Sequence, residues 1–245
     1  MVGSFTNGVS VYDGMPYAGV TDLELLAVEA ALRLVWAESS KRFHCHKIDF
    51  CKANEDQISS ALVSVFANIL KGEDDRKLLS NLAKVFQPQP EFNSQYGAAD
   101  YLGKALTFRP DLTFRRVYTP PGMDPLNSCL FVEAKVMDQN KKMGNYCGDG
   151  LIRFVNGTYA WAMPQAIMLG YLKQTDQQLP GTLAAHFRRR GKRALYNLEN
   201  GPTAFPLSPF ADRTYVTVHD RTWTYPETNG SPGPIKVLHL WLTVA

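Results

Sequence analysis

The chain has 245 residues, 45% hydrophobic and 20% charged, which is the composition of an ordinary soluble globular protein with a substantial apolar core. No apolar run approaches a membrane span, and the first residues lack the charged-then-apolar pattern of a secretory leader, so we expect a cytoplasmic protein without a membrane partner. The formal net charge of +3 neither requires nor excludes a nucleic-acid partner, which depends on where the cations lie.

Helices are predicted in the N-terminal part of the chain. Thr21 is in the position of a cap for a helix from residue 22 to about residue 40, and Asn54 for a second helix that ends near residue 70. The second helix has apolar residues at helical spacing: Ile58, Leu62, Val65, Phe66 and Ile69. A short third helix is expected over 78–85, followed by a loop or linker over 87–95.

The middle of the chain predicts a β-hairpin. Residues 113–118 and 129–136 have the character of strands, and residues 119–127 between them are dense in turn formers. If Val117 faces Ser128 across this loop, antiparallel pairing places Asp111 opposite Ala134. This register is predicted to within about two residues.

The C-terminal part is expected to alternate helix and strand. A helix over 151–162 ends before Pro164, and residues 166–172 form an apolar run typical of a buried strand. Residues 201–209 are expected to be a loop. Strands over 214–219 and 235–244 are predicted to pair as a C-terminal hairpin that extends the sheet.

Three charged residues of the central hairpin are the strongest functional signal. Glu133 and Lys135 alternate with Ala134, so both side chains leave the same side of an otherwise apolar strand. Burial of such charges costs several kcal/mol unless they have partners or a metal. With Asp111 nearby, two carboxylates provide the hard oxygen ligands that Mg²⁺ prefers, and the lysine can orient or help deprotonate the attacking water.

Each of these residues also has an ordinary structural explanation. Asp111 follows Pro110 and could cap a turn, and Glu133 with Lys135 could form an ion pair at a sheet edge. Glu55 lies on the inward face of the second helix, where it could supply a third carboxylate. It could equally be a first-turn residue favoured by the helix dipole.

Pro110-Asp111, followed by Glu133-Ala-Lys135, resembles the signature of the PD-(D/E)xK nuclease superfamily. The resemblance covers roughly residues 50–172 and implies an α/β (α+β) fold: a restriction-endonuclease-like mixed central sheet flanked by helices. Together with the C-terminal hairpin, this predicts a single nuclease domain over 1–245, with helical and β extensions to the core.

The resemblance also implies a function. Asp111 and Glu133 would bind Mg²⁺ or Mn²⁺, Glu55 would be a further candidate ligand, and Lys135 would act on the attacking water. The substrate would be DNA in preference to RNA. The chain also looks like effector nucleases of bacterial antiphage defence systems, which implies a regulatory partner protein or a homo-oligomer.

Nucleic-acid contacts are expected from two groups of cations. The first lies near the hairpin and comprises Arg115, Arg116, Lys141, Lys142 and Arg153. The second is a cluster that comprises Arg188, Arg189, Arg190, Lys192 and Arg193, which could hold a phosphate backbone or be a solvated helix end or an acidic-protein interface.

Two other functions remain open from the sequence. A non-catalytic subunit could keep the nuclease fold for binding nucleic acid or proteins, although it would have no need for all three charged residues. A different hydrolase could use the same metal chemistry on nucleotides or small phosphate esters.

Overall fold

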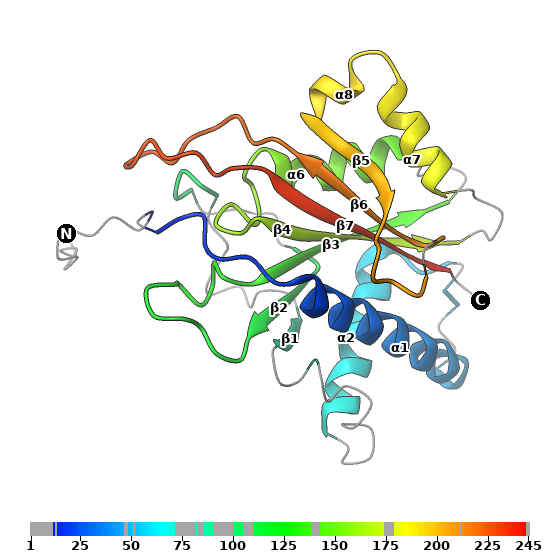
Figure 1. Ribbon diagram of the computed structural model, residues 1–245. Coiled ribbons are helices and arrows are strands. Elements are labelled where there is room, and N and C mark those ends of the chain that lie inside the picture. Colours follow the sequence, from blue (N-terminus) through cyan, green and yellow to red (C-terminus); the bar gives the residue numbers. More distant parts are fainter. Residues whose placement is uncertain are drawn as a thin grey trace.

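The computed structural model describes residues 12, 14–46, 49–50, 52–71, 82, 86–90, 100–104, 110–138, 143–173, 179–210 and 212–243. In these ranges the strands form one seven-stranded mixed sheet in the order β1-β2-β3-β4-β7-β6-β5 (Figure 1). The strands are β1 (Phe86–Pro90), β2 (Leu112–Arg116), β3 (Leu130–Met137), β4 (Gln165–Leu172), β5 (Leu198–Ala204), β6 (Thr214–His219) and β7 (Ile235–Thr243). The helices are α1 (Asp22–His46), α2 (Glu55–Lys71), α5 (Met143–Asn145), the π-helix η1 (Tyr146–Leu151), α6 (Ile152–Val155), α7 (Leu179–Arg188) and α8 (Lys192–Leu195).

Helices cover both faces of the sheet, which confirms the predicted α/β class. Helices α1 and α2 lie on one face, and α6, α7 and α8 lie on the other (Figure 1). Trp36 of α1 stacks on Tyr171 of β4, and Ser59 of α2 hydrogen-bonds to the same tyrosine. The centre of the molecule is therefore a three-layer sandwich built on β4.

The parallel strands β3, β4 and β7 form the centre of the sheet. The pairing places Lys135 of β3 beside Gly170 of β4, and Gly170 beside Trp241 of β7. Strand β4 is apolar and buried along nearly its whole length, as expected for a strand that is covered on both faces. The strand predicted over 166–172 is confirmed.

Both edges of the sheet differ from the sequence-based prediction. The loop expected over 87–95 begins instead with β1, which pairs antiparallel with β2. Pro88 and Pro90 are tolerated there because an edge strand need not donate every amide to a neighbour. The predicted C-terminal hairpin of β6 and β7 is confirmed, but β5, which overlaps the loop expected over 201–209, adds a further edge strand.

The helix expected over 151–162 is also different. The helical segment starts earlier, at Met143, passes through η1, and ends at Val155. Gly157 has a positive φ of 76° and Ala160 one of 50°, so the chain leaves the helix before Tyr159. Tyr159 and Ala162 are nevertheless buried, which explains why their apolar spacing resembled a helical face.

The starts of the first two helices agree with the sequence. The Glu24 amide donates to Thr21 Oγ1, and the Thr21 amide donates to Glu24 Oε2, which is a capping box. Asn54 and Gln57 exchange the same pair of bonds at α2. Most of the helix expected over 78–85 lies outside the described residues.

The first helix is fixed to the C-terminal strands by buried polar groups. Glu29 accepts hydrogen bonds from Arg33, Ser208 and Thr214, and Arg33 also donates to the Trp241 carbonyl. The bonds with Ser208, Thr214 and the Trp241 carbonyl join segments about two hundred residues apart in the chain. None of the described helices is both long and apolar enough to cross a membrane.

Candidate active site where β2 leaves β3

The site lies where β2 and β3 separate. Their pairing runs from Phe114 with Leu130 to Leu112 with Val132, one residue away from the predicted register. The difference matters, because side chains alternate faces and a one-residue slip moves a side chain to the other side. Continued by one residue, the observed register places Asp111 opposite Glu133 and not opposite Ala134. Residues opposite each other in an antiparallel pair point to the same face, so the two carboxylates lie on one side of the sheet.

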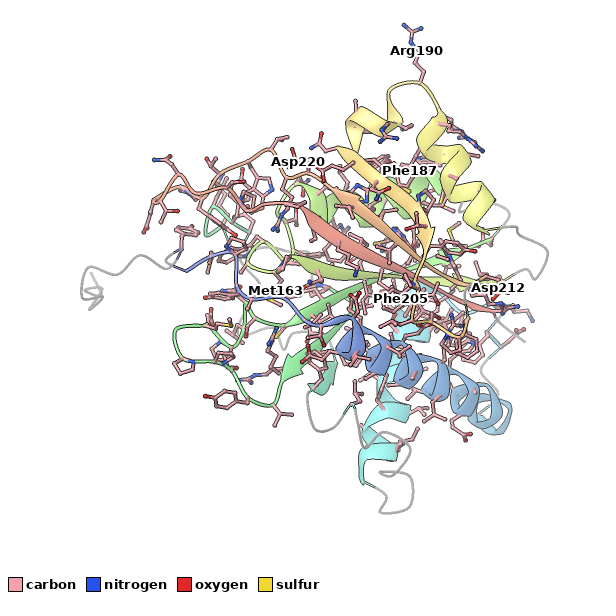
Figure 2. All side chains as sticks on the ribbon, in the orientation of Figure 1. Met163, Phe187, Arg190, Phe205, Asp212 and Asp220 are labelled. Carbon is pink, nitrogen blue, oxygen red and sulfur yellow. The ribbon has the colours of Figure 1, made fainter. Side chains whose placement is uncertain are left out.

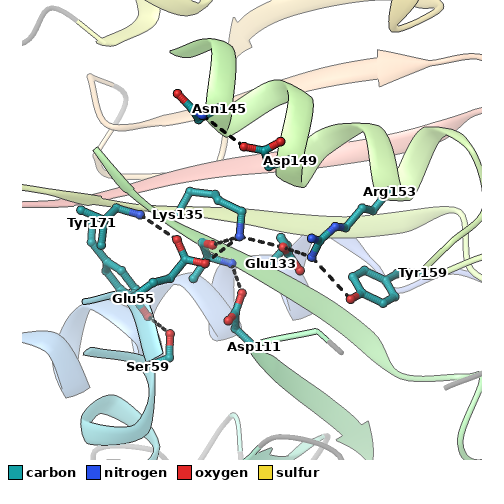
Figure 3. Close-up of polar contacts among 12 residues, drawn as sticks. Glu55, Ser59, Asp111, Glu133, Lys135, Asn145, Asp149, Arg153, Tyr159 and Tyr171 are labelled. Atoms are coloured by element: carbon teal, nitrogen blue, oxygen red, sulfur yellow. Dashed lines mark hydrogen bonds and ion pairs between the residues drawn. The ribbon is translucent and has the colours of Figure 1, made fainter. Parts of the chain in front are cut away.

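The open side of β3 beyond Val132 is occupied by carboxylates. The Ala134 amide donates to Asp111 Oδ2 at 2.7 Å, and the Val136 amide donates to Glu55 Oε2 at 3.2 Å (Figure 3). Both acids therefore replace the hydrogen bonds that a neighbouring strand would otherwise provide. Burial, and secondarily the charge of Glu133, raises the pKa of Asp111 to about 7.

Glu133 is the most deeply buried of the three acids, with 1% of its side chain exposed. Its Oε1 contacts Lys135 Nζ at 2.8 Å and Arg153 Nη1 at 2.6 Å. Its Oε2 is buried and has no hydrogen-bond partner among the described residues. Burial raises the pKa of this carboxyl, and the two cations oppose the shift.

Lys135 lies at the centre of the group (Figure 3). Its ammonium contacts Glu55 Oε1 and the Ala134 carbonyl at 2.7 Å each, besides Glu133. Burial would lower the pKa of this lysine, but the surrounding carboxylates outweigh burial and raise it. A solvent-facing ion pair at a sheet edge, one of the ordinary explanations for Glu133 and Lys135, is therefore not what the structure shows.

Arg153 comes to the site from α6, although the sequence suggested it only as a nucleic-acid contact. Its Nη1 also lies 3.5 Å from the hydroxyl of Tyr159, and its guanidinium lies 5.7 Å from the centre of that ring. Helix η1 packs closely on β3 and β4 at Gly150, where a Cβ would lie 3.4 Å from Glu133 Cγ and 2.6 Å from Met168 Cε. π-Helical turns often occur at functional sites.

The other predicted cations are distributed more widely. Arg116 donates from Nη2 to the carbonyls of Ala18 and Gly19, at 2.9 and 3.0 Å, so it ties β2 to the N-terminal segment. Arg115 is half-buried on β2. Lys141 and Lys142 lie outside the described residues. The second predicted group of cations lies at the turn between α7 and α8.

The site residues are compatible with a divalent cation. No group of three or more His, Cys, Asp or Glu side chains in the described ranges is placed to hold a metal ion. The ammonium of Lys135 lies between Glu55 and Glu133, which leaves Asp111 and Glu133 as the pair. Mg²⁺ needs only one or two carboxylates, because it keeps several waters. The unpartnered Oε2 of Glu133 fits such a ligand role.

Sequence reasoning missed two parts of this site. The pairing of Arg153 with Glu133 joins positions 20 residues apart, on helix α6 and strand β3. The apolar spacing predicts Tyr159 to be a helical core residue, whereas it lies beyond the end of α6 and contacts Arg153. The only local signal for Arg153 was a cation on the helix that follows the motif.

No protein-family model, no curated protein and no solved structure matches this chain.

Proposed function

We propose that this protein is a metal-dependent nuclease that hydrolyses phosphodiester bonds, with DNA the preferred substrate over RNA. The observation that carries the proposal is the convergence of Asp111, Glu133 and Lys135 at the point where β2 leaves β3. A protein that used these residues only for stability would gain little, because buried ion pairs contribute little net stability.

Each residue has a role in this proposal. Asp111 and Glu133 would hold the metal, with the unpartnered Glu133 Oε2 as one ligand atom. The bound ion would polarise the phosphoryl group and lower the pKa of a water molecule. Lys135 would orient that water and offset the negative charge that develops on the phosphate.

Glu55 supports the site in one of two ways. It stays a candidate third ligand, but both of its oxygens are engaged, one with Lys135 and one with the Val136 amide. This arrangement favours a role in which Glu55 holds the lysine ammonium in position. The attacking water would then find Lys135 already oriented.

The test is a cleavage assay with matched variants. Supercoiled DNA, single-stranded DNA, RNA and nucleotides are each incubated with Mg²⁺ or Mn²⁺ and with the parent, Asp111→Asn, Lys135→Met or Asp124→Asn. Asparagine can still accept the Ala134 amide bond, so Asp111→Asn should remain folded. Asp124 is the matched control, because its carboxylate also accepts a backbone amide, that of Leu126, but in the loop at the other end of the hairpin.

We expect the parent to cut nucleic acid and both site variants to lose about 100-fold or more of the rate. The Asp124→Asn variant should cut as the parent does. Cleavage by Asp111→Asn at the parent rate would refute the assignment. A parent that cuts no substrate with either metal would support a non-catalytic binding subunit, and cleavage of nucleotides alone would support the small-phosphate hydrolase.

A further inference from the structure

The turn between α7 and α8 carries a concentrated positive charge. Arg188, Arg189 and Arg190 are consecutive and exposed, and Arg190 projects from the end of the turn (Figure 2). With Lys192 and Arg193, the turn has five cations, whereas the formal charge of the chain is +3, so all other residues together carry −2. In the part of the chain that the structure describes, none of the five pairs with a carboxylate.

Buried rings hold this turn against the body of the protein. Phe187 and Tyr196, on either side of the turn, lie 5.7 Å apart between ring centres, and Phe187 also packs on His219 of β6. Lys192 lies over the Tyr196 ring at 6.0 Å. The arginines therefore extend from a fixed base, which reduces the conformational entropy lost when they bind a ligand.

The turn lies on the same face of the sheet as Glu133, with η1 between them. A Cβ on Gly150 would lie 3.4 Å from Glu133 Cγ, and a Cβ on Gly148 would lie 3.9 Å from the Tyr196 hydroxyl. One helix, about 10 Å wide, therefore separates the carboxylate from the base of the turn. A nucleic-acid strand advances about 3.4 Å per nucleotide, so roughly three to six nucleotides would cover the path from Glu133 to the arginines.

We infer that the α7–α8 turn is an anchoring site for the phosphate backbone of a nucleic-acid strand that extends from the site at Glu133 across η1. The inference rests on the proposed function and makes it more specific. A mononucleotide or a small phosphate ester cannot reach both places, so the substrate is a polymer. Arginine forks bind phosphate oxygens without regard to base, so the anchor adds affinity but no sequence preference.

The path has one feature that opposes such a strand. Asp149 is an exposed acid of η1, between the two glycines, and accepts a hydrogen bond from Asn145 at 3.2 Å (Figure 3). Its charge would repel a phosphate that crosses the helix. Removing the charge of Asp149 should therefore strengthen binding of the strand. This substitution tests the path independently of the arginines.

The experiment measures binding without cleavage. Fluorescence anisotropy with labelled 20-nucleotide DNA and RNA strands is recorded in Ca²⁺ over a series of salt concentrations. The key variant replaces Arg188, Arg189 and Arg190 with glutamine, and the matched control replaces the same three with lysine, which keeps the charge. The Asp149→Asn variant tests the path, and polyglutamate of equal charge tests for an acidic-protein partner.

We expect the glutamine variant to bind the strands at least about tenfold more weakly, with a salt slope lower by about 2 for three lost phosphate contacts. The lysine variant should stay within threefold of the parent, and Asp149→Asn should bind two- to fivefold more tightly. Parent-like binding by the glutamine variant, unchanged binding by Asp149→Asn, or equal binding of polyglutamate through the same arginines would each overturn the inference.

Its failure is distinguishable from failure of the proposed function. Strand binding that depends on the arginines, without any Asp111-dependent cleavage, would leave the anchor standing and refute the nuclease. Asp111-dependent cleavage with unchanged binding by the glutamine variant would refute the anchor and leave the nuclease standing. For a working nuclease, the glutamine variant should raise KM for the strand.

Discussion

Arg153 Nη1 lies 2.6 Å from Oε1 of Glu133, the same oxygen that Lys135 contacts at 2.8 Å. Two cations on one oxygen leave the other oxygen, Oε2, without a partner among the described residues. The arginine therefore fixes the direction of the carboxylate, in the way that outer partners orient metal ligands. Glu133 is held in place by a residue that need not touch the substrate.

The first prediction concerns this pair. Arg153→Gln should lower the free energy of unfolding by on the order of 1–3 kcal/mol, because the buried Glu133 loses a charged hydrogen bond. Chemical denaturation measures this loss, and combining it with Glu133→Gln in a double-mutant cycle isolates the pair. If the two single losses in unfolding free energy simply add in the double variant, Arg153 and Glu133 are not energetically coupled.

The same substitution should also affect catalysis. In the proposed nuclease, Arg153→Gln should lower kcat by about 10- to 100-fold, the usual effect of removing a partner of a metal ligand. Arg153→Lys should recover part of the rate, because an ammonium can still reach Oε1. If Arg153→Gln kept the kcat and the Mn²⁺ affinity of the parent, Arg153 would contribute to stability alone.

A second prediction separates the two roles of Glu55. If Glu55 holds Lys135, Glu55→Gln should leave Mn²⁺ affinity within about threefold of the parent, because the proposed metal ligands, Asp111 and Glu133, are untouched. Titration calorimetry on the folded protein gives this affinity without an activity assay. A loss of tenfold or more would instead make Glu55 a ligand.

A buried chain of polar groups links β6, β7 and η1. His219 and His239 both contact the hydroxyl of Thr217 at 2.7 Å, His239 contacts the Tyr146 hydroxyl at 2.9 Å, and His219 contacts the Tyr196 carbonyl at 2.8 Å. Burial lowers the pKa of His219 to about 4 and that of His239 well below its usual value. Both histidines are therefore neutral in the folded protein at neutral pH.

This arrangement predicts a loss of stability in mild acid. The unfolded chain takes up protons on both histidines as the pH falls below about 6.5, whereas the folded protein does so on His219 only near pH 4. The stability that the two neutral histidines contribute is therefore fully present above about pH 6.5 and is lost as the pH is lowered, whereas protonation of Asp111, whose pKa is raised to about 7, opposes part of that loss. Between pH 6 and 4.5 each histidine should contribute a slope of about 1.4 kcal/mol per pH unit. Urea unfolding of His219→Gln should show a shallower dependence, and an unchanged slope would contradict the assignment.

The last prediction concerns the packing of β4 on β7. A Cβ on Gly170 would lie 2.3 Å from Trp241 Cε3, inside a fully buried ring, so Gly170→Ala should cost about 1–3 kcal/mol or more. Gly181 is the matched control, because nothing lies within 4 Å of its Cβ position and it is in helix α7. Gly181→Ala should stabilise the protein by about 0.5–1 kcal/mol. Thermal unfolding distinguishes the two, and equal effects would refute the packing argument.

Local patterns in the sequence were sufficient for most of the elements. The helix caps at Thr21 and Asn54, the strand over 214–219 and the buried strand over 166–172 depend on residues close together in the chain, and all are confirmed. The sequence also predicts that Glu133 and Ala134 point to opposite faces of β3, because neighbouring residues of a strand alternate faces whatever the partner strand is. The sequence therefore determined which residues could form the site.

Tertiary structure decided how those residues meet. Counting across the hairpin gave a register one residue away from the observed one, because the loop length does not specify where pairing stops. The separation of β2 from β3, the approach of η1 through Gly150 and the contact of Arg153 with Glu133 all come from packing between segments far apart in the chain. Burial of Glu133 Oε2 is a property of that packing, since no local pattern specifies which atoms water can no longer reach.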